Sequence, residues 1–294
     1  MATSWIVFAL IYPALFALIN IVDKFLLEKR IRDYRCICLV VGFVALPAMI
    51  ALLLLASWDT VTPARIGLGL FSGLLIAISY PIYFRMLSTE EVSRVISIYY
   101  AAPVLVTFFA AVILRETLLW WKYVAIIAAA AGAVLIGIER FERIPVMRKG
   151  FWVMMLMCVF IGIVNVIGKY LLESMSIWNV IGLELVGVSS LTLYIFSPHA
   201  RKHVRIALKS LHLIMFSEYT TYAAWLLWAA ATAQASVALV SAMGSLQPLY
   251  VLLLMLALSL FMPHILKEVF TKKTALIKVI SVLMIVIGTF FVAL

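Results

Sequence analysis

Ten apolar runs, each about as long as a membrane-spanning helix, cover most of the chain and limit what it can fold into. They lie near residues 4–27, 35–56, 65–86, 93–114, 118–138, 150–172, 176–196, 211–232, 235–261 and 275–294. A helix needs about 20 apolar residues to cross a bilayer, and only helices and closed barrels satisfy the whole backbone in lipid. Runs of this length favour helices. The sequence therefore predicts an all-α integral membrane protein with ten transmembrane helices.

Composition agrees with this class. Apolar residues make up 66% of the 294 residues and charged residues only 12%, which excludes an ordinary soluble domain. The net charge of +10 comes from short connectors rather than from one soluble face, so we expect no nucleic-acid partner. The longest polar stretches, Glu139 to Lys149 and Ser197 to Lys209, are expected to be connectors.

The two halves of the chain repeat each other at an offset of 145 residues. The aligned pairs include Asn20 with Asn165, Lys24 with Lys169, Glu28 with Glu173, Gly42 with Gly187, Ser72 with Ser217, and Pro103 with Pro248. Each half holds five runs, an odd number, so the second half enters the membrane from the opposite side. We expect two inverted-topology five-helix repeats, residues 1–145 and 146–294, as in alternating-access transporters.

The basic residues predict an orientation. Eighteen of the 23 Lys and Arg residues lie in the connectors after the first, third, fifth, seventh and ninth runs, and three, Arg65, Arg115 and Lys122, lie on the other side. Positive charge collects on the cytoplasmic side of membrane proteins. We therefore expect both termini outside the cytoplasm, in the cytoplasmic membrane of a prokaryote.

Two carboxylates inside predicted spans are the first candidates for a functional site. Glu184 lies near the middle of the seventh run, and Glu218 lies about two turns into the eighth. A charge at the bilayer centre costs roughly 2.5–3.5 kcal/mol, so such residues normally face a cavity or a partner. Each is a candidate for contacting substrate or taking up a coupling proton. The alternative is a carboxylate hydrogen-bonded to a neighbouring helix for packing alone.

A second candidate set repeats between the halves. Asn20 with Lys24, and Asn165 with Lys169, lie one helical turn apart, so each pair can present an amide and an ammonium to the same space. The alternative is that the lysines extend to opposite interfaces while the asparagines bind neighbouring backbone. Asp23 has no counterpart in the second half and is interpreted as balancing charge near the helix end.

Two prolines predict kinks. Pro103 and Pro248 lie inside the fourth and ninth spans, where each removes a backbone hydrogen bond and crowds the preceding turn. Polar and aromatic side chains that we expect near the resulting cavity are Tyr99, Gln247, Tyr80 and Trp225. The alternatives are kinks that serve packing only and aromatic residues that face lipid.

Motifs of other function classes are missing from the sequence. It contains no phosphate-binding loop, zinc-site spacing or hydrolytic triad. We therefore expect no enzyme activity, no cofactor, no metal and no coupling to ATP hydrolysis.

The chain resembles the EamA-like family of the drug/metabolite transporter superfamily. The resemblance rests on the aromatic end of the third span, the link Glu91 to Arg94, Pro103, and Arg115-Glu116 before a glycine-bearing fifth span. In the second half, Ser236-Val237, Gln247-Pro248, Lys267-Glu268 and Gly288 repeat this order, with an insertion at Met262 to Thr274. The resemblance implies ten helices in two inverted repeats, a central cavity, and movement of small metabolites without ATP. In many similar proteins the basic connectors indicate cytoplasmic termini, whereas the count here indicates the reverse, so either the orientation is inverted or one span is miscounted.

These features predict a secondary transporter or facilitator of a small polar metabolite, with a cavity lined by the first, third, fourth and sixth to ninth helices. Proton coupling, with Glu184 as the first choice of coupling group, is part of this hypothesis. The expected partners are the substrate and membrane lipids, and the protein is expected to be a monomer or a homodimer. The alternatives are a flippase of a lipid or lipid-linked sugar on the same fold and, less favoured, a non-transporting membrane subunit.

Overall fold

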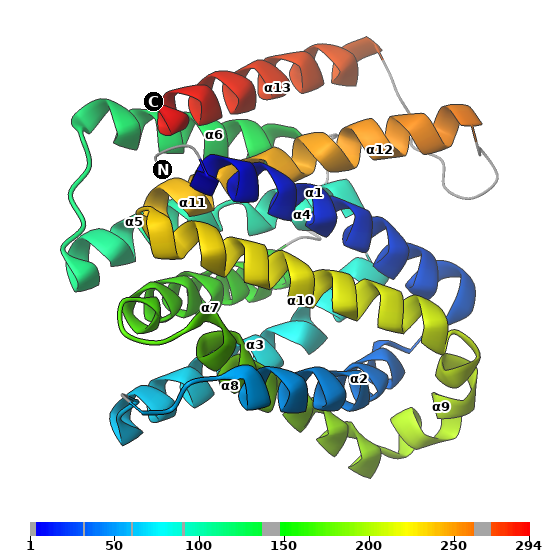
Figure 1. Cartoon of the computed structure of the whole chain (residues 1–294). Helices are drawn as coiled ribbons and strands as arrows, with labels where there is room; N and C mark the ends of the chain where they lie inside the picture. Colours follow the sequence, from blue (N-terminus) through cyan, green and yellow to red (C-terminus); the bar gives the residue numbers. More distant parts are fainter. Residues whose placement is uncertain (1–3, 32, 60, 90–91, 137–147, 262–271) are drawn as a thin grey trace.

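The computed structural model describes residues 4–31, 33–59, 61–89, 92–136, 148–261 and 272–294, and within these ranges every regular element is a helix (Figure 1). The first half contains α1 (Ser4–Phe25), η1 (Leu26–Arg30), α2 (Tyr34–Leu55), α3 (Pro63–Thr89), α4 (Val92–Tyr99), α5 (Ala102–Phe109), η2 (Ala110–Leu114) and α6 (Trp120–Ile136). The second half contains α7 (Arg148–Leu172), α8 (Ile177–Ser189), η4 (Ser190–Phe196), α9 (Pro198–Lys209), α10 (Leu211–Gln234), α11 (Val237–Met243), η5 (Gly244–Leu246), α12 (Gln247–Phe261) and α13 (Lys272–Ala293).

Some of the expectations lie outside the described residues. These are the repeat boundary at residue 145, Glu91 of the fourth-span link, and most of the insertion at Met262 to Thr274, with Lys267 and Glu268 inside it.

Among the described residues, six helical segments are long and apolar enough to cross a membrane. They are Ser4–Arg30, Tyr34–Leu55, Pro63–Thr89, Gly150–Leu172, Ile177–Phe196 and Val237–Ser259. Three shorter apolar helices, Ala102–Leu114, Trp120–Leu135 and Ile277–Ala293, accompany them. Helix α10 is long, but Ser217, Glu218 and Thr221 make it more polar than these segments, and all three are buried. The predicted class, an all-α multi-pass membrane protein, is confirmed.

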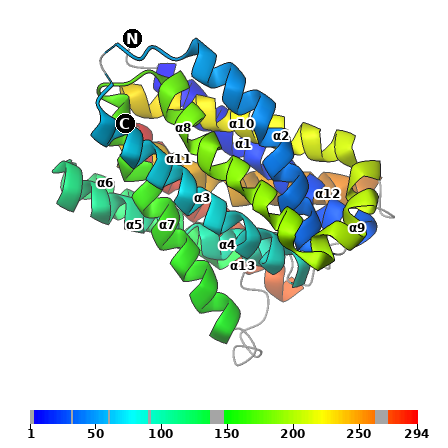
Figure 2. The same cartoon turned by 90° about the horizontal axis from the view of Figure 1, so that it is seen from below.

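The helices pack in matched pairs. Helices α6 and α13 pack together on one side of the bundle, and α2 and α8 pack together on the opposite side (Figures 1 and 2). Between them α1 packs on α10, and α7 packs on α3. Similarly, α1 contacts α12, and α7 contacts α5. The pair α1–α10 thus corresponds to the pair α7–α3 when the two halves are exchanged, and α1–α12 corresponds to α7–α5 in the same way.

Close backbone contact fixes the α3–α8 crossing. A Cβ atom added to Gly187 of α8 would lie 2.0 Å from the carbonyl carbon of Gly73 in α3, closer than any side chain permits. A Cβ atom on Gly73 would likewise meet the backbone oxygen of Glu184 at 2.5 Å. The two helices can approach this closely only because both positions are glycine. The contact holds Glu184 beside the middle of α3.

Two spans are interrupted near their prolines. The fourth span consists of α4 and α5, which are separated by a turn at Tyr100 and Ala101 just before Pro103. The ninth span changes to a 3-10 turn at Gly244–Leu246 before α12 begins, and Pro248 is the second residue of α12. Proline lacks the backbone N–H that a continuous helix needs at these points.

The predicted connector at Ser197 to Lys209 forms a helix of its own, α9. Pro198 begins it, where the missing N–H costs nothing. Ala200 and Ala207 are buried, and the helix packs against α2. Arg201 and Arg205 lie on its exposed side. This arrangement is typical of an amphipathic connector at a membrane surface.

Candidate functional site

A cavity of about 200 Å³ lies in the middle of the bundle. Its walls come from α1, α3, α4, α5, α7, α8, α10, α11 and α12, with Gly244 of the 3-10 turn η5. These elements belong to the seven spans that we expected to line a cavity, and they include both interrupted spans. For comparison, a cavity of about 150 Å³ can hold a benzene molecule. The site therefore has room for a compact molecule.

The lining is acidic and aromatic. Its carboxylates are Asp23, Glu184 and Glu218, and its amides are Asn20, Asn165 and Gln247. Its aromatic side chains are Tyr12, Phe16, Tyr80, Tyr83, Phe84, Tyr99, Tyr100, Trp225 and Trp228. None of the lining residues that the structure describes is lysine, arginine or histidine. The cavity thus contains three carboxyl groups and no basic side chain among its described walls.

Five polar side chains form a hydrogen-bond chain with one direction. The Tyr100 hydroxyl donates to Oε1 of Gln247, and Nε2 of Gln247 donates to Oδ1 of Asn20. Nδ2 of Asn20 donates to the Tyr83 hydroxyl at 2.8 Å, and that hydroxyl donates to Oδ2 of Asp23 at 3.1 Å. Every donor points along the chain toward Asp23. The chain runs from the break in the fourth span through α12, α1 and α3 and ends on α1 at Asp23.

The position of Asp23 differs from the one that we expected from the sequence. It is 4% exposed and accepts a second hydrogen bond from Ser217 of α10, at 2.6 Å to Oδ1. It is therefore a buried acceptor in the cavity wall and does not merely balance charge at a helix end. Its spacing of three residues from Asn20 indicates this position in the sequence, because residues at that spacing lie on one helical face.

The second half has a different pair at the corresponding place. Gly168 corresponds to Asp23 and Trp228 to Tyr83, at the same offset of 145 residues. A Cβ atom on Gly168 would lie 2.7 Å from the Trp228 ring. The glycine thus makes room for an indole where the first half has a carboxylate and a phenol. The cavity is asymmetric at this point, because α1 supplies a carboxylate here and α7 does not.

Glu218 lies on the α10 side of the cavity. It is 3% exposed, and its Oε2 accepts a hydrogen bond from Tyr80 of α3 at 3.0 Å. Tyr80 and Tyr83 lie one turn apart on α3 and bind Glu218 and Asp23, respectively. The two carboxylates therefore accept hydrogen bonds from one face of α3, and both line the cavity.

Glu184 lines the cavity from α8. It is 2% exposed, and its Oε1 accepts a hydrogen bond from Ser72 of α3 at 2.7 Å. The Gly73–Gly187 contact brings the two helices together here. Asn165 also lines the cavity, but its Nδ2 donates to the carbonyl of Ile161 in its own helix, at 2.7 Å. The paired asparagines therefore have different partners.

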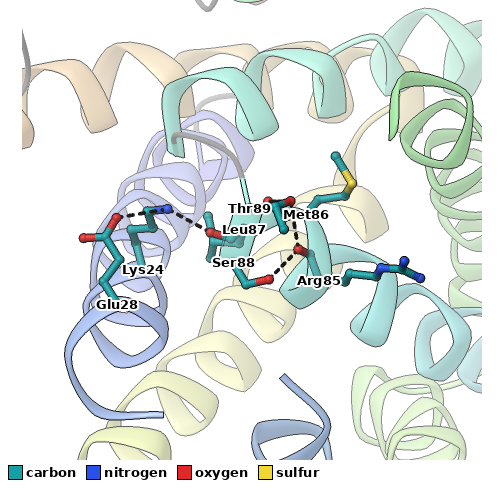
Figure 3. A network of polar contacts seen from close by, with 7 residues as sticks. All are labelled: Lys24, Glu28, Arg85, Met86, Leu87, Ser88 and Thr89. Carbon is teal, nitrogen blue, oxygen red and sulfur yellow. Dashed lines mark hydrogen bonds and ion pairs between the residues drawn. The ribbon is translucent and has the colours of Figure 1, made fainter. Parts of the chain in front are cut away.

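Lys24 and Lys169 lie outside the cavity lining and bind the ends of other helices. Lys24 Nζ donates to the carbonyl of Leu87 at 2.9 Å and pairs with Glu28 at 3.1 Å (Figure 3). Lys169 Nζ donates to the carbonyls of Thr232 and Ala235, at 3.0 and 3.1 Å. Both lysines thus bind carbonyls at helix C-termini, which lack partners inside the helix.

These lysine contacts repeat at the offset seen in the sequence. Leu87 and Thr232 are 145 residues apart, as are Lys24 and Lys169. In each half, the lysine side chain reaches a carbonyl 63 residues further along the chain. At the end of α3, the hydroxyls of Ser88 and Thr89 donate to the backbone carbonyl of Arg85 (Figure 3).

The remaining predicted residues surround the breaks in the helices. Pro103 lines the cavity, and the carbonyl of Tyr99, four residues before it, accepts a contact from the Cys158 thiol at 3.6 Å. Tyr99 and Trp225 both line the cavity, whereas Pro248 is not among its lining residues. Cys158 is a buried free thiol, and so are Cys36 and Cys38.

Glu116 joins the two halves outside the cavity. Its Oε2 accepts a hydrogen bond from Ser236 at 2.6 Å, and its Oε1 accepts one from the backbone N–H of Val237 at 3.4 Å. These contacts place a carboxylate at the N-terminus of α11, where it stabilises the helix. Arg115 before it has φ of 58°, the left-handed conformation that ends the preceding π-helical turn. Within the described residues, no cluster of His, Cys, Asp and Glu is suited to a metal ion.

Comparison with known proteins bears on the family and the fold. Residues 3–138 match the profile of the EamA-like transporter family. Over these residues the chain is similar to EamA-like transporters. This match confirms the resemblance described from the residues. The EamA-like segment includes Asn20, Asp23, Tyr80, Tyr83 and the broken fourth span.

The fold of the complete chain also matches a solved structure. One crystal structure superimposes with a TM-score of 0.69 at 16% sequence identity, covering 99% of this chain and 97% of the other. At this identity the likeness shows the fold alone. No curated protein matches the sequence. The fold thus extends beyond the EamA-like half to nearly the whole chain.

Proposed function

We propose that this protein is a secondary transporter or facilitator that moves a small polar metabolite across the membrane by alternating access, without ATP hydrolysis. The observation that carries the proposal is the cavity at the two broken spans, walled by helices of both halves. Non-helical backbone at membrane depth occurs where it is buried in protein or lines a cavity. The EamA-like match of the first half supports the transporter class.

Ten spans in two inverted repeats, 1–145 and 146–294, are part of the proposal. The repeated lysine contacts and the exchanged helix pairs support it, because contacts with the same offset arise when two similar halves adopt one fold. Inverted halves can exchange conformations, which makes an inward-open and an outward-open state similar in energy. That similarity is the energetic requirement for alternating access.

The proposal includes an orientation with both termini outside the cytoplasm of a prokaryotic cell. It rests on the eighteen basic residues on one side against three on the other. A reporter fused after Leu294 tests it, because a fusion that is active only outside the cytoplasm supports the orientation. A fusion active only inside the cytoplasm contradicts it.

We further propose proton coupling through a cavity carboxyl group, with Glu184 as first candidate. The residue is buried, faces the cavity and has a single hydroxyl donor from Ser72 at 2.7 Å. Glu184→Gln removes the proton site while keeping the size of the side chain. Proteoliposomes with this variant should lose proton-driven uptake and keep substrate exchange. Unchanged gradient-driven uptake would exclude Glu184 as the coupling group.

The transport proposal is tested by a ligand screen followed by flux measurements. Purified protein is screened by thermal shift against amines, amino acids, sugars, nucleotide sugars and isoprenoid-linked sugars. A soluble compound that raises the melting temperature is then loaded into proteoliposomes without ATP. Counterflow of that compound, absent from protein-free vesicles, supports the transporter. Stabilisation by isoprenoid-linked compounds alone, followed by their scrambling between leaflets, supports the flippase instead.

A further inference from the structure

We propose that the substrate of this cavity is a compact organic cation, with an ammonium group held by Glu218 and Asp23 against aromatic walls. This inference rests on the proposed transport function and names the chemical class that the site would carry. It follows from the balance of charge in the cavity, the position of two carboxylates and the chemistry of the walls.

The described lining of the cavity has more acidic than basic side chains. Three carboxylates line the cavity, and none of its described lining residues is basic. Asp23, Glu184 and Glu218 are each at most 4% exposed, so bulk water solvates them little. In their ionised form, buried carboxylates are stable only when they are hydrogen-bonded and their charge is balanced. Lys24, the lysine nearest to Asp23 in sequence, binds Leu87 and Glu28 outside the lining.

The two carboxylates on the α1–α10 side are placed to share one cation. Tyr80 and Tyr83, one turn apart on α3, donate to Glu218 and Asp23, and Ser217 ties Asp23 to the residue just before Glu218. An ionised carboxylate has about four acceptor positions. The hydrogen bond from Tyr80 fills one of these positions on Glu218, and other acceptor positions remain for an N–H donor. An ammonium group offers three such donors and no acceptor.

The hydrogen-bond chain favours a donor ligand over an anion. The hydroxyl protons of Tyr100 and Tyr83, and one N–H each of Gln247 and Asn20, are directed along the chain, which ends on the carboxylate of Asp23. An anion would meet the three carboxyl groups of the lining. A cation would find acceptors.

The aromatic walls suit the same ligand class. Tyr80 lies 5.9 Å from Phe84, and Tyr83 lies 5.1 Å from Phe84, measured between ring centroids, so α3 presents a continuous aromatic surface beside the carboxylates. Trp225 extends this surface from α10. Aromatic faces attract cations, most strongly where water is excluded. A volume of about 200 Å³ limits the ligand to about one ring and a short side chain.

Three probes of one size test the proposal. Benzylammonium, benzyl alcohol and benzoate carry a positive, zero and negative charge on the same ring. Binding to the purified full-length protein is measured at neutral pH by calorimetry and thermal shift. We expect benzylammonium to bind at least tenfold more tightly than either of the other two. Absence of benzylammonium binding, or equal affinity for the three probes, would overturn the proposal.

Substitutions of the two carboxylates test where the ammonium group binds in the cavity. Glu218→Gln and Asp23→Asn should each weaken benzylammonium binding at least tenfold and leave benzyl alcohol binding unchanged. Glu173→Gln, which removes an exposed carboxylate at the end of α7, is the matched control and should bind like the native protein. The melting temperature without ligand shows whether each variant is folded. If folded Glu218→Gln and Asp23→Asn proteins both bind benzylammonium as the control does, the assignment is wrong.

Flux measurements separate this inference from the proposed function. Selective benzylammonium binding without counterflow of any bound amine would support the cation site and contradict transport. Counterflow of neutral or anionic solutes, with no preference for amines, would support transport and contradict the cation site.

Discussion

Ser217 donates a hydrogen bond to Oδ1 of Asp23 at 2.6 Å and thereby joins α10 of the second half to α1 of the first. Ser72, which lies 145 residues before Ser217, donates in the same way to Glu184 of α8 at 2.7 Å. In each half, this serine therefore binds a carboxylate of the other half. Both contacts border the cavity, so a change in the relative position of the halves must alter them.

Replacing Gln247 by methionine should break the hydrogen-bond chain. Gln247 connects the Tyr100 hydroxyl to Asn20, and all three line the cavity. Methionine keeps a similar length but leaves two buried polar groups without this partner, which costs about 1–3 kcal/mol for each group. We expect a lower free energy of unfolding in denaturant titrations in detergent micelles. Gln234→Met, at the exposed end of α10, is the control and should change stability little.

Removing either helix-binding lysine should destabilise the protein to a similar extent. Lys24→Met and Lys169→Met each remove a charged donor from carbonyls at a helix C-terminus. Hydrogen bonds to charged groups contribute about 1.5–3 kcal/mol. The same titration measures the loss, with Lys29→Met at an exposed position as control. A loss confined to one lysine variant would contradict the equivalence of the two contacts.

Adding a methyl group to Gly187 should separate α3 from α8. The new Cβ atom would meet the Gly73 backbone at 2.0 Å, and backbone cannot rotate away as a side chain can. Overpacking of this kind costs about 1–3 kcal/mol. We expect Gly187→Ala to lower the melting temperature. Gly67→Ala is the matched control on α3, because nothing lies within 4 Å of its added Cβ, and it should be neutral or stabilising. Equal behaviour of the two variants would exclude the close crossing.

Glu116→Gln should weaken the start of α11. The carboxylate accepts hydrogen bonds from Ser236 and from the Val237 backbone N–H, and its negative charge lies at the helix N-terminus. Losing the charge should cost about 0.3–1 kcal/mol. Thermal unfolding at low and high salt checks this, since the difference from the native protein should shrink as salt screens the charge. A difference independent of salt would mean that the charge of Glu116 does not act on the helix.

The sequence was sufficient for the fold class and for much of the cavity wall. Apolar runs of membrane-spanning length predicted helices because lipid leaves the backbone few alternatives. Glu184 and Glu218 were found because a carboxylate inside an apolar run is costly, and both line the cavity. The offset of 145 residues paired Lys24 with Lys169, and the two make equivalent contacts.

Other features depend on contacts that a single sequence does not contain. The direction of the Lys24 side chain depends on where α3 ends, which brings the Leu87 carbonyl within 2.9 Å. Asp23 lies next to Lys24 and has no repeat partner, so pairing within the sequence favoured a local role. Its true partners, Tyr83 and Ser217, are 60 and 194 residues away. Only the packing of α1 against α3 and α10 reveals its position.

We propose that the cavity opens to each side of the membrane in turn. One labelling experiment tests this alternation directly. Ser79→Cys places a thiol in the cavity wall, in a protein whose Cys36, Cys38 and Cys158 are replaced by alanine. Ser281→Cys on α13 is the control, because Ser281, like Ser79, is buried and bonds the carbonyl four residues before it.

A membrane-impermeant thiol reagent is applied to either side of vesicles of known orientation. Alternating access predicts that Ser79→Cys reacts from both sides, while Ser281→Cys reacts from neither. Reaction of Ser79→Cys from one side only, or from neither, would contradict the account.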